Sequence, residues 1–154
     1  MLNYPGERGQ VLYGEGLFIG YRAFDRTGVE PRFPFGHGLS YTSFSYGAAS
    51  VAGDGSSVSV DVTNTGSVAG DEVVQLYVRD VESTLSRPDK ELKGFVRLRD
   101  LAPGESRAAT FALYDRSFAF WDPAEHDWVV EPGEFELLLA SSAADIRSRT
   151  TLVR

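Results

Sequence analysis

Apolar and polar residues alternate along most of the chain from Tyr41 onward, with the period of two that is typical of half-buried β-strands. The clearest example is Val58-Ser59-Val60-Asp61-Val62, which runs into the turn-forming residues Asn64-Thr65-Gly66. Proline–glycine pairs at Pro103-Gly104 and Pro132-Gly133 mark two further turns. Other strand-like segments lie at 72–78, 92–101, 109–113, 118–120, 128–130, 135–139 and 150–153. About seven or eight short strands with turns roughly every 8–12 residues predict an all-β fold, a two-sheet β-sandwich over 41–154.

The first 40 residues follow a different pattern. Leu17, Phe18, Tyr21 and Phe24 are spaced as on one face of a helix, so we expect one or two helical turns within a short, otherwise irregular extension. This extension has too little apolar surface for a core of its own. Residues 1–40 are therefore predicted either to fold back along the sandwich or to mediate self-association.

The composition narrows the possible partners. The chain has 154 residues, enough for one domain with an appendage, and 15 Lys and Arg against 22 Asp and Glu give a net charge of −7. This charge argues against nucleic acids and anionic membranes, which bind basic surfaces. The absence of cysteine excludes disulfides and thiolate chemistry. No apolar stretch approaches the roughly 20 residues of a membrane-spanning helix, and the compartment, secreted or cytoplasmic, stays open.

The ionisable residues do not predict a reaction centre. His37 and His126, the two histidines, lack metal-ligand spacing, and no run of acidic residues has the spacing of a calcium loop. Catalysis by paired carboxylates needs convergent groups, whereas the neighbours Asp71 and Glu72 point to opposite faces of a strand. We therefore predict no catalytic residue, no metal site and no cofactor within this chain.

Trp121 is the aromatic side chain most expected at a surface contact. It follows Phe118 and Phe120 in the alternation, so core positions for the two phenylalanines place Trp121 on the outer face. Trp128 and Tyr77 are predicted to be displayed in the same way. An exposed ring suits either packing against another domain or stacking on a sugar, and domain packing is the commoner use.

Five segments, taken together and in order, resemble one family. They are YGEGLFIGYR (13–22), FPFGHGLSYT (33–42), VTNTGSVAGDEVVQLYV (62–78), KELKGF (90–95) and EPGEF (131–135). The combination resembles the C-terminal fibronectin type III-like domain of glycoside hydrolase family 3, the β-glucosidase family. The resemblance implies an immunoglobulin/fibronectin type III-like β-sandwich at 41–154. Residues 1–40 would then be a remnant of the preceding α/β domain and a linker loop.

The same resemblance implies a function for the chain. The family's catalytic aspartate and glutamate belong to domains that precede this region, so no catalytic residue is carried over. The partners implied are the upstream catalytic domains, with a β-glucoside or glucan as a possible ligand. The loop that holds Phe35 and His37 would border the substrate cleft, and Tyr21, Arg22 and Trp121 would serve interdomain packing.

The role implied is that of an accessory, stabilising domain of a β-glucosidase-like retaining hydrolase, inactive as an isolated chain. Two alternatives remain open. One is a carbohydrate-binding module, and the other is a non-catalytic cell-surface interaction module, which β-sandwiches often form.

Overall fold

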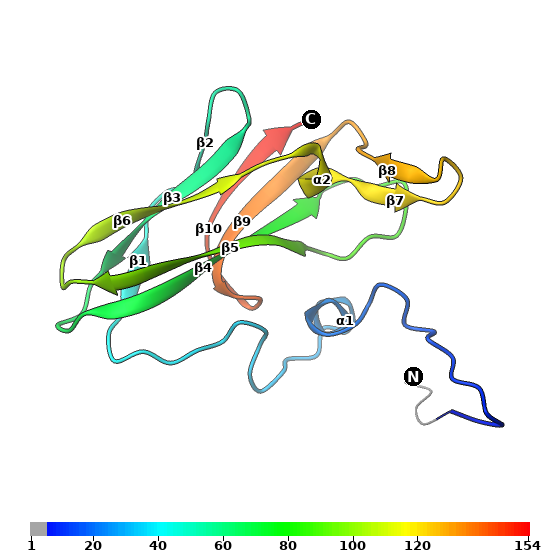
Figure 1. Ribbon diagram of the computed structural model, residues 1–154, viewed down its shortest axis with the longest axis horizontal. Helices are drawn as coiled ribbons and strands as arrows, with labels where there is room; N and C mark the ends of the chain where they lie inside the picture. The colour runs from blue at the N-terminus through cyan, green and yellow to red at the C-terminus, as the bar shows by residue number, and fades with distance from the viewer. Residues whose placement is uncertain (1–5) are drawn as a thin grey trace.

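The computed structural model describes residues 6–154, and all but two of the strands in this range form two antiparallel sheets packed face to face (Figure 1). The first sheet holds β1 (Phe44–Tyr46), β2 (Ser50–Val51), β3 (Ser57–Asn64) and β6 (Ser106–Ala112). The second holds β4 (Gly70–Asp80), β5 (Glu91–Leu101), β9 (Glu134–Ser142) and β10 (Asp145–Val153). The remaining elements are the hairpin of β7 (Phe120–Asp122) and β8 (Asp127–Val129), and the helices α1 (Tyr21–Thr27) and α2 (Asp115–Phe118).

Each sheet is organised around an inner strand, β3 in the first sheet and β4 in the second. One edge of β3 pairs with β6, and its other edge pairs first with β2 and then with β1. In the second sheet the order is β10-β9-β4-β5. The predicted all-β, two-sheet sandwich is therefore confirmed, and each turn expected at a proline–glycine pair joins two consecutive strands or leads into one.

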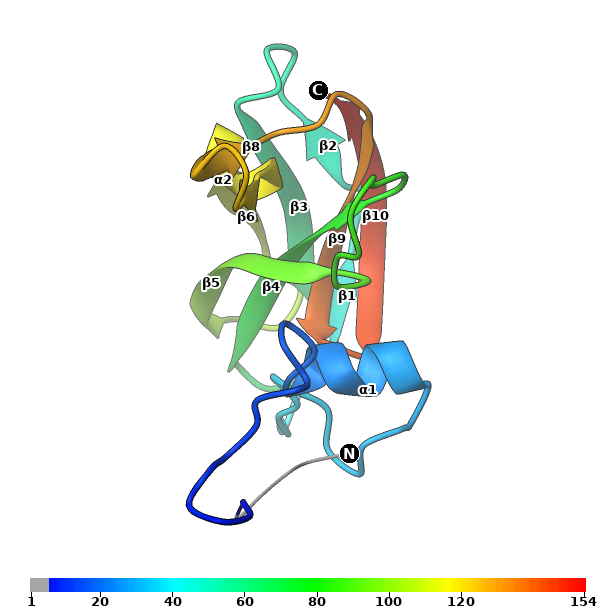
Figure 2. The same cartoon turned by 90° about the vertical axis from the view of Figure 1, so that its right-hand side faces the viewer.

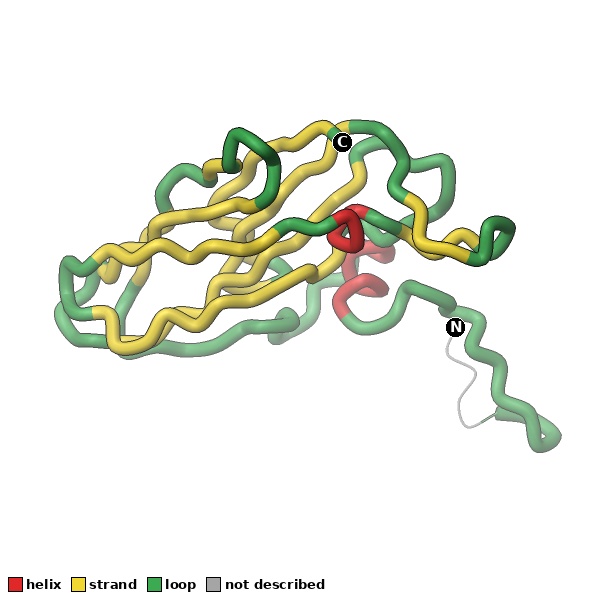
Figure 3. The backbone as a smooth tube through the Cα atoms, turned by 45° about the horizontal axis from the view of Figure 1, so that its top comes forward, coloured by secondary structure: helices red, strands yellow, loops and turns green. Residues whose placement is uncertain are grey.

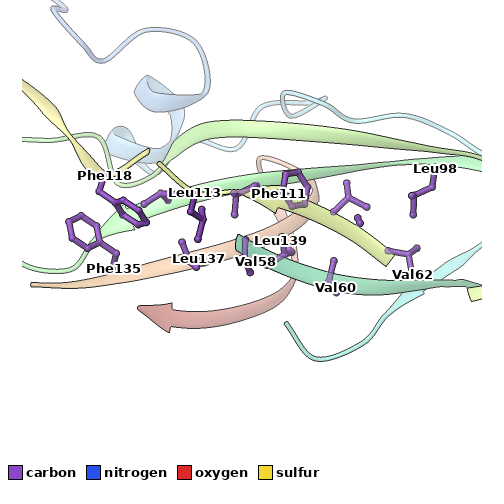
Figure 4. Packing of buried hydrophobic residues seen from close by; sticks show 14 of the residues in the cluster. Val58, Val60, Val62, Leu98, Phe111, Leu113, Phe118, Phe135, Leu137 and Leu139 are labelled. Carbon is purple, nitrogen blue, oxygen red and sulfur yellow. The ribbon is translucent and has the colours of Figure 1, made fainter. Parts of the chain in front are cut away.

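Alternate side chains of the facing strands fill the space between the sheets (Figure 4). The apolar residues that alternate in the sequence are the ones that point inward. They include Val58, Val60 and Val62 on β3, Val74, Leu76 and Val78 on β4, and Phe135, Leu137 and Leu139 on β9. Burial of each such side chain contributes about 1.5–3 kcal/mol, so this core is the main source of stability for the sandwich.

Asn64 is a buried polar residue that ties three segments together at one end of the sandwich. Its Oδ1 accepts hydrogen bonds from the Thr42 hydroxyl (2.6 Å) and the Gly66 N–H (3.0 Å). Its Nδ2 donates to the backbone oxygens of Val68 and Leu101, each at 2.8 Å. Because all four hydrogen-bonding positions of this amide are used, the residue holds the chain before β1 against the ends of β3 and β5.

One local prediction is wrong. Phe118 does not continue a strand with Phe120 but ends α2, a single turn between β6 and β7 (Figure 3). Two reciprocal hydrogen bonds close the turn. The Ser117 N–H donates to the backbone oxygen of Tyr114 (2.8 Å), and the Tyr114 N–H donates to the Ser117 hydroxyl (3.2 Å). Phe118 is still fully buried, since the turn directs its ring into the core.

The N-terminal extension contains the one helix that the sequence predicted, although α1 begins at Tyr21 and not at Leu17. Gly20 and Gly28, both with positive φ (55° and 64°), bound the helix. Figure 2 shows α1 lying across the outer side of the second sheet. Among residues 6–154, neither helix is long or apolar enough to cross a bilayer.

Candidate interdomain surface

The outer face of the second sheet is apolar beneath the extension. Tyr77 on β4, and Leu138 and Ala140 on β9, point away from the main core, yet all three are buried. Tyr21 covers them, because its ring meets that of Tyr77 edge-on with centroids 5.6 Å apart, and Phe35 lies 5.6 Å from Tyr21. The expectation that Tyr77 is displayed at the surface is wrong, since the extension folds back over this face.

Two hydrogen bonds fix the extension to the backbone of the sandwich. The N–H of Leu92 on β5 donates to the hydroxyl of Tyr21 (2.9 Å). The N–H of Ala143, in the turn after β9, donates to the backbone oxygen of Phe35 (2.8 Å). These bonds satisfy main-chain groups of the sandwich that the extension would otherwise bury unpaired.

Gly36 lets the loop approach the sheet more closely than another residue would. Its φ is +81°, and a Cβ placed there would lie 2.0 Å from Nε2 of Gln75 on β4. That Nε2 donates to the Ser141 backbone oxygen (2.9 Å), and the Tyr77 hydroxyl donates to Gln75 Oε1 (2.6 Å). The glycine therefore protects a buried polar network on the outer face of β4.

Glu91 is the centre of an ion cluster that joins α1 to β5. Its carboxylate lies 3.1 Å from Arg22, 3.3 Å from Arg87 and 3.1 Å from Lys93. Burial alone would raise the pKa of Glu91, but the three cations together hold it below its ordinary value. Burial lowers the pKa of Lys93, although Glu91 counteracts this change. Arg22, predicted to serve interdomain packing, thus anchors the helix to the sandwich.

The same cluster continues toward the β7–β8 hairpin. Arg87, whose side chain is only 8% exposed, also donates to Asp80 (2.8 Å) and to the backbone oxygen of Phe118 (3.0 Å). Lys90 pairs with Asp25 of α1 (2.6 Å). Arg22, Glu91, Arg87 and Asp80 therefore form a connected set of charges that links the extension, the loop after β4 and the segment that leads into the hairpin, and the Lys90–Asp25 pair is a separate link to α1.

The loop after α1 turns apolar side chains to the outside. Phe33, Leu39 and Tyr41 are largely or fully exposed, and the Phe33 ring lies 5.6 Å from the His37 ring. Phe35 is half-exposed beside Tyr21. The loop is already docked on the sandwich, yet these large apolar side chains face outward. Such an exposed apolar surface is typical of a contact with another protein or domain.

Phe35 and His37, predicted to border a cleft together, line different concavities. Phe35 lines a pocket of about 260 Å³ next to α1, together with Tyr21 and Val29. His37 lines a groove of about 600 Å³ between the loop and the start of β4, together with Leu39. The two concavities are neighbours, because Pro34 and Ala144 line both, so the two side chains lie on adjacent parts of the surface.

The groove has a polar end that is satisfied internally. The hydroxyl of Tyr46 donates to Glu72 (2.6 Å), and both side chains are half-buried. Burial raises the pKa of Glu72 above its ordinary value, and burial together with the Glu72 charge raises the pKa of Tyr46. Among the described residues, no group of three or more His, Cys, Asp or Glu side chains is placed to hold a metal ion.

Trp121 lies on the β7–β8 hairpin, where it is paired directly across the two strands with Trp128. The rings meet at 66° with centroids 5.7 Å apart, and each side chain is a little under half exposed. The Arg116 guanidinium lies on the Trp128 ring, 3.2 Å from its centroid. The predicted outward position of Trp121 agrees with this arrangement, and part of its exposed area is available to a partner.

Sequence reasoning missed Gln75 and Glu91, the two polar residues that organise the docked face. A signal existed for each. Gln75 interrupts an otherwise apolar run, and Glu91 is surrounded by Arg87, Lys90 and Lys93 at intervals of one to four residues.

Comparison with known proteins identifies the class. Residues 72–143 match the model of the fibronectin type III-like domain. The chain is 53% identical over 151 residues to thermostable β-glucosidase B of Acetivibrio thermocellus, and 43% identical over 155 residues to an exo-α-(1→6)-L-arabinopyranosidase of Bifidobacterium breve. These matches cover 94% and 99% of this chain but only 20% of each relative.

The solved structures agree. The crystal structure of a Bifidobacterium adolescentis GH3 β-glucosidase superimposes with a TM-score of 0.91 at 40% identity, covering 98% of this chain and 23% of that one. The chain therefore fits the C-terminal fibronectin type III-like domain of the family 3 β-glucosidases that it matches. It spans about one fifth of the length of the curated relatives it matches.

Proposed function

We propose that this chain is an accessory domain of a longer family 3 hydrolase, and that it packs against the upstream part of that enzyme and stabilises it. The observation that carries the proposal is the docked extension. Tyr21 and Arg22 are engaged with the sandwich, while Phe33, Leu39 and Tyr41 of the following loop face outward without cover in residues 6–154. The relatives have about four fifths of their length outside the segment that matches this chain, and a domain in that part would be the partner.

The catalytic carboxylates of the enzyme would lie in that upstream part. In support, the most buried acidic residues of this chain have structural partners, with Asp80 on Arg87, Glu91 on three cations and Glu72 on Tyr46. Carboxyl groups used in this way are not free to act as a nucleophile or an acid on a glycoside. The proposed substrate is a glycoside, with a β-glucoside favoured by the names of the relatives.

Individual residues take distinct roles in this proposal. Tyr21 and Arg22 hold the extension in the position from which the upstream domain continues, and Trp121 adds a contact from the hairpin. His37 and Phe35 lie at the edge of the substrate cleft. Alanine at His37 in an assembled enzyme is expected to raise KM for an aryl β-glucoside, and unchanged kcat and KM would remove His37 from the cleft edge.

A chimera tests the proposal. The matching 151 residues of the Acetivibrio thermocellus enzyme are replaced by this chain, and solubility, β-glucosidase activity and thermal inactivation are compared with those of the same enzyme truncated before this region. We expect the chimera to regain much of the stability that the truncated enzyme loses. The proposal fails if the chimera behaves like the truncated enzyme while the restored native domain rescues it.

A carbohydrate-binding module is the second candidate, favoured by the half-exposed pair Trp121 and Trp128. It predicts that the isolated chain is retained on insoluble glucan and that Trp121→Ala abolishes retention. The accessory-domain proposal predicts no retention.

A further inference from the structure

The bare part of the second sheet's outer face carries an apolar patch that the extension does not cover. Phe95, at the middle of β5, is 70% exposed, and Val73 on β4 is 39% exposed. Phe95 pairs across the strands with Gln75, whose side chain meets Gly36 on the outer face. Cross-strand partners share a face, so Phe95 points to the same side as the docked extension.

This patch is continuous with the exposed side of the loop. Gly36 contacts Gln75, its neighbour His37 stacks near Phe33, and Leu39 lines the same groove as Val73. We define the Phe95 patch as Phe95, Val73, Leu39 and Phe33. Its border is polar, because Arg97, the cross-strand partner of Val73, donates to Asp71 (2.8 Å). An apolar centre with a paired, charged rim is the usual composition of a protein interface.

The position of the chain indicates the occupant. Figures 1 and 2 agree that α1 and the described residues before it lie on the outer side of the β10-β9-β4-β5 sheet, the side to which the Phe95 patch points. A domain joined to this chain from its N-terminal side would start on the same side of the sandwich as the patch. The relatives are about five times as long as the segment they share with this chain, so a partner of sufficient size is available.

We propose that the Phe95 patch is the surface on which the upstream domain of the same polypeptide docks. That domain buries Phe95 and inserts an apolar element into the groove between Leu39 and Val73. The proposal rests on the proposed function and adds to it a specific face of the sandwich, beyond the extension itself. It requires that Phe95 contributes little to the folding of this chain alone, because its ring is exposed there.

Photo-crosslinking in the chimera tests the occupant directly. p-Benzoylphenylalanine is placed at Phe95, or as a control at Val153, which is equally exposed near the end of β10. After irradiation, mass spectrometry of the digest is expected to find position 95 joined to a peptide from upstream of this chain, and position 153 joined to none. Crosslinks from position 95 only to a second copy of the chain, or to nothing, overturn the proposal.

A pair of variants supplies a second readout. Phe95→Ser is expected to accelerate thermal inactivation of the chimera about tenfold, since a ring loses its burial against the upstream domain. The same substitution is expected to leave the unfolding midpoint of the isolated 154-residue chain unchanged, as is Val153→Ser in both proteins. Equal destabilisation of the isolated chain by Phe95→Ser contradicts the proposal.

The two proposals fail in different ways. A chimera that is stable and active but insensitive to Phe95→Ser overturns only the assignment of this face. A chimera with native Phe95 that does not assemble overturns both proposals.

Discussion

Gly36 is the residue at which the extension comes closest to the sheet. Its positive φ and its close contact with Gln75 are both incompatible with a side chain. Gln75 is hydrogen-bonded to Ser141 and Tyr77, so a side chain at position 36 would disturb these buried hydrogen bonds. A single methyl group at this position therefore tests whether the docked loop and the sheet form one unit.

We expect Gly36→Ala to lower the free energy of unfolding by about 2 kcal/mol, because the methyl group displaces Gln75 and leaves buried polar groups unpaired. Urea unfolding of the chain followed by tryptophan fluorescence measures this change. Gly38→Ala is the matched control, since a Cβ there meets nothing within 4 Å. It is expected to change the stability by less than about 0.5 kcal/mol. Equal effects of the two variants would contradict the role of Gly36.

Glu72 makes the folding stability of the chain depend on pH, and the direction of its pKa shift fixes the sign of that dependence. Its pKa is raised by burial, so the folded chain binds this proton more tightly than the unfolded chain. The carboxyl group therefore contributes stability below its ordinary pKa of 4.5, and that contribution is lost as the pH rises through the raised value. Ionised Glu72 is a cost to folding at neutral pH.

Glu72→Gln is expected to remove that cost while it keeps an oxygen acceptor for the Tyr46 hydroxyl. The variant should gain stability relative to the natural chain at pH 7, and the gain should shrink as the pH falls to 4. Urea midpoints measured at intervals between pH 4 and pH 8 check this. A gain that grows toward acid pH would show that the sign is wrong.

At the scale of elements, the Glu91 cluster attaches α1 to β5. Helix α1 has seven residues, too few to be stable as an isolated helix, so its structure depends on these contacts and on the packing of Tyr21. Removal of the Glu91 carboxylate leaves two partly buried cations, Arg22 and Lys93, without an acidic partner, whereas Arg87 keeps Asp80. The carboxylate therefore contributes more to stability than any one of its pairs indicates.

Glu91→Gln is therefore expected to destabilise the chain by about 2–4 kcal/mol and to release α1. Hydrogen exchange of residues 21–28 and urea unfolding measure the two effects. The control is Glu136→Gln, which removes the single, more exposed partner of Arg79 and is expected to cost less than about 1 kcal/mol. Protection of α1 that survives in Glu91→Gln would show that aromatic packing alone holds the helix.

The elements also show what alternation can predict. It located β3, β4, β5 and β9 because each has one face in the main core, where apolar residues recur with period two. It failed at Tyr77, because the period of a strand does not reveal whether its second face is covered. It failed at Phe118 as well, since a four-residue helix is shorter than the window that a helical period needs. The ion cluster arises from contacts between distant segments, which no local pattern contains.

For the whole molecule, the question is where the folded unit begins. The family resemblance predicts a division of the chain after residue 40. The segment before that point nevertheless covers the second cluster of buried residues, Tyr77, Leu138, Ala140 and Ala143, which we call the smaller core. We therefore expect the sandwich and the docked part of the extension to unfold as one cooperative unit. The outward-facing side chains of this unit are the ones that we propose to contact the upstream part of a longer enzyme.

Two truncations test this unit. Removal of residues 1–40 exposes Tyr77 and Leu138, so we expect it to lower the free energy of unfolding by about 4 kcal/mol and to increase binding of the dye ANS. Removal of residues 1–19 leaves the contacts of Tyr21, Arg22 and Gly36 in place and is expected to cost less than about 1 kcal/mol. If residues 41–154 alone are as stable as the complete chain, the extension is an independent linker and the smaller core contributes nothing to folding. If only the longer truncation destabilises the chain, a useful domain boundary for engineering lies near Gly20, where α1 begins.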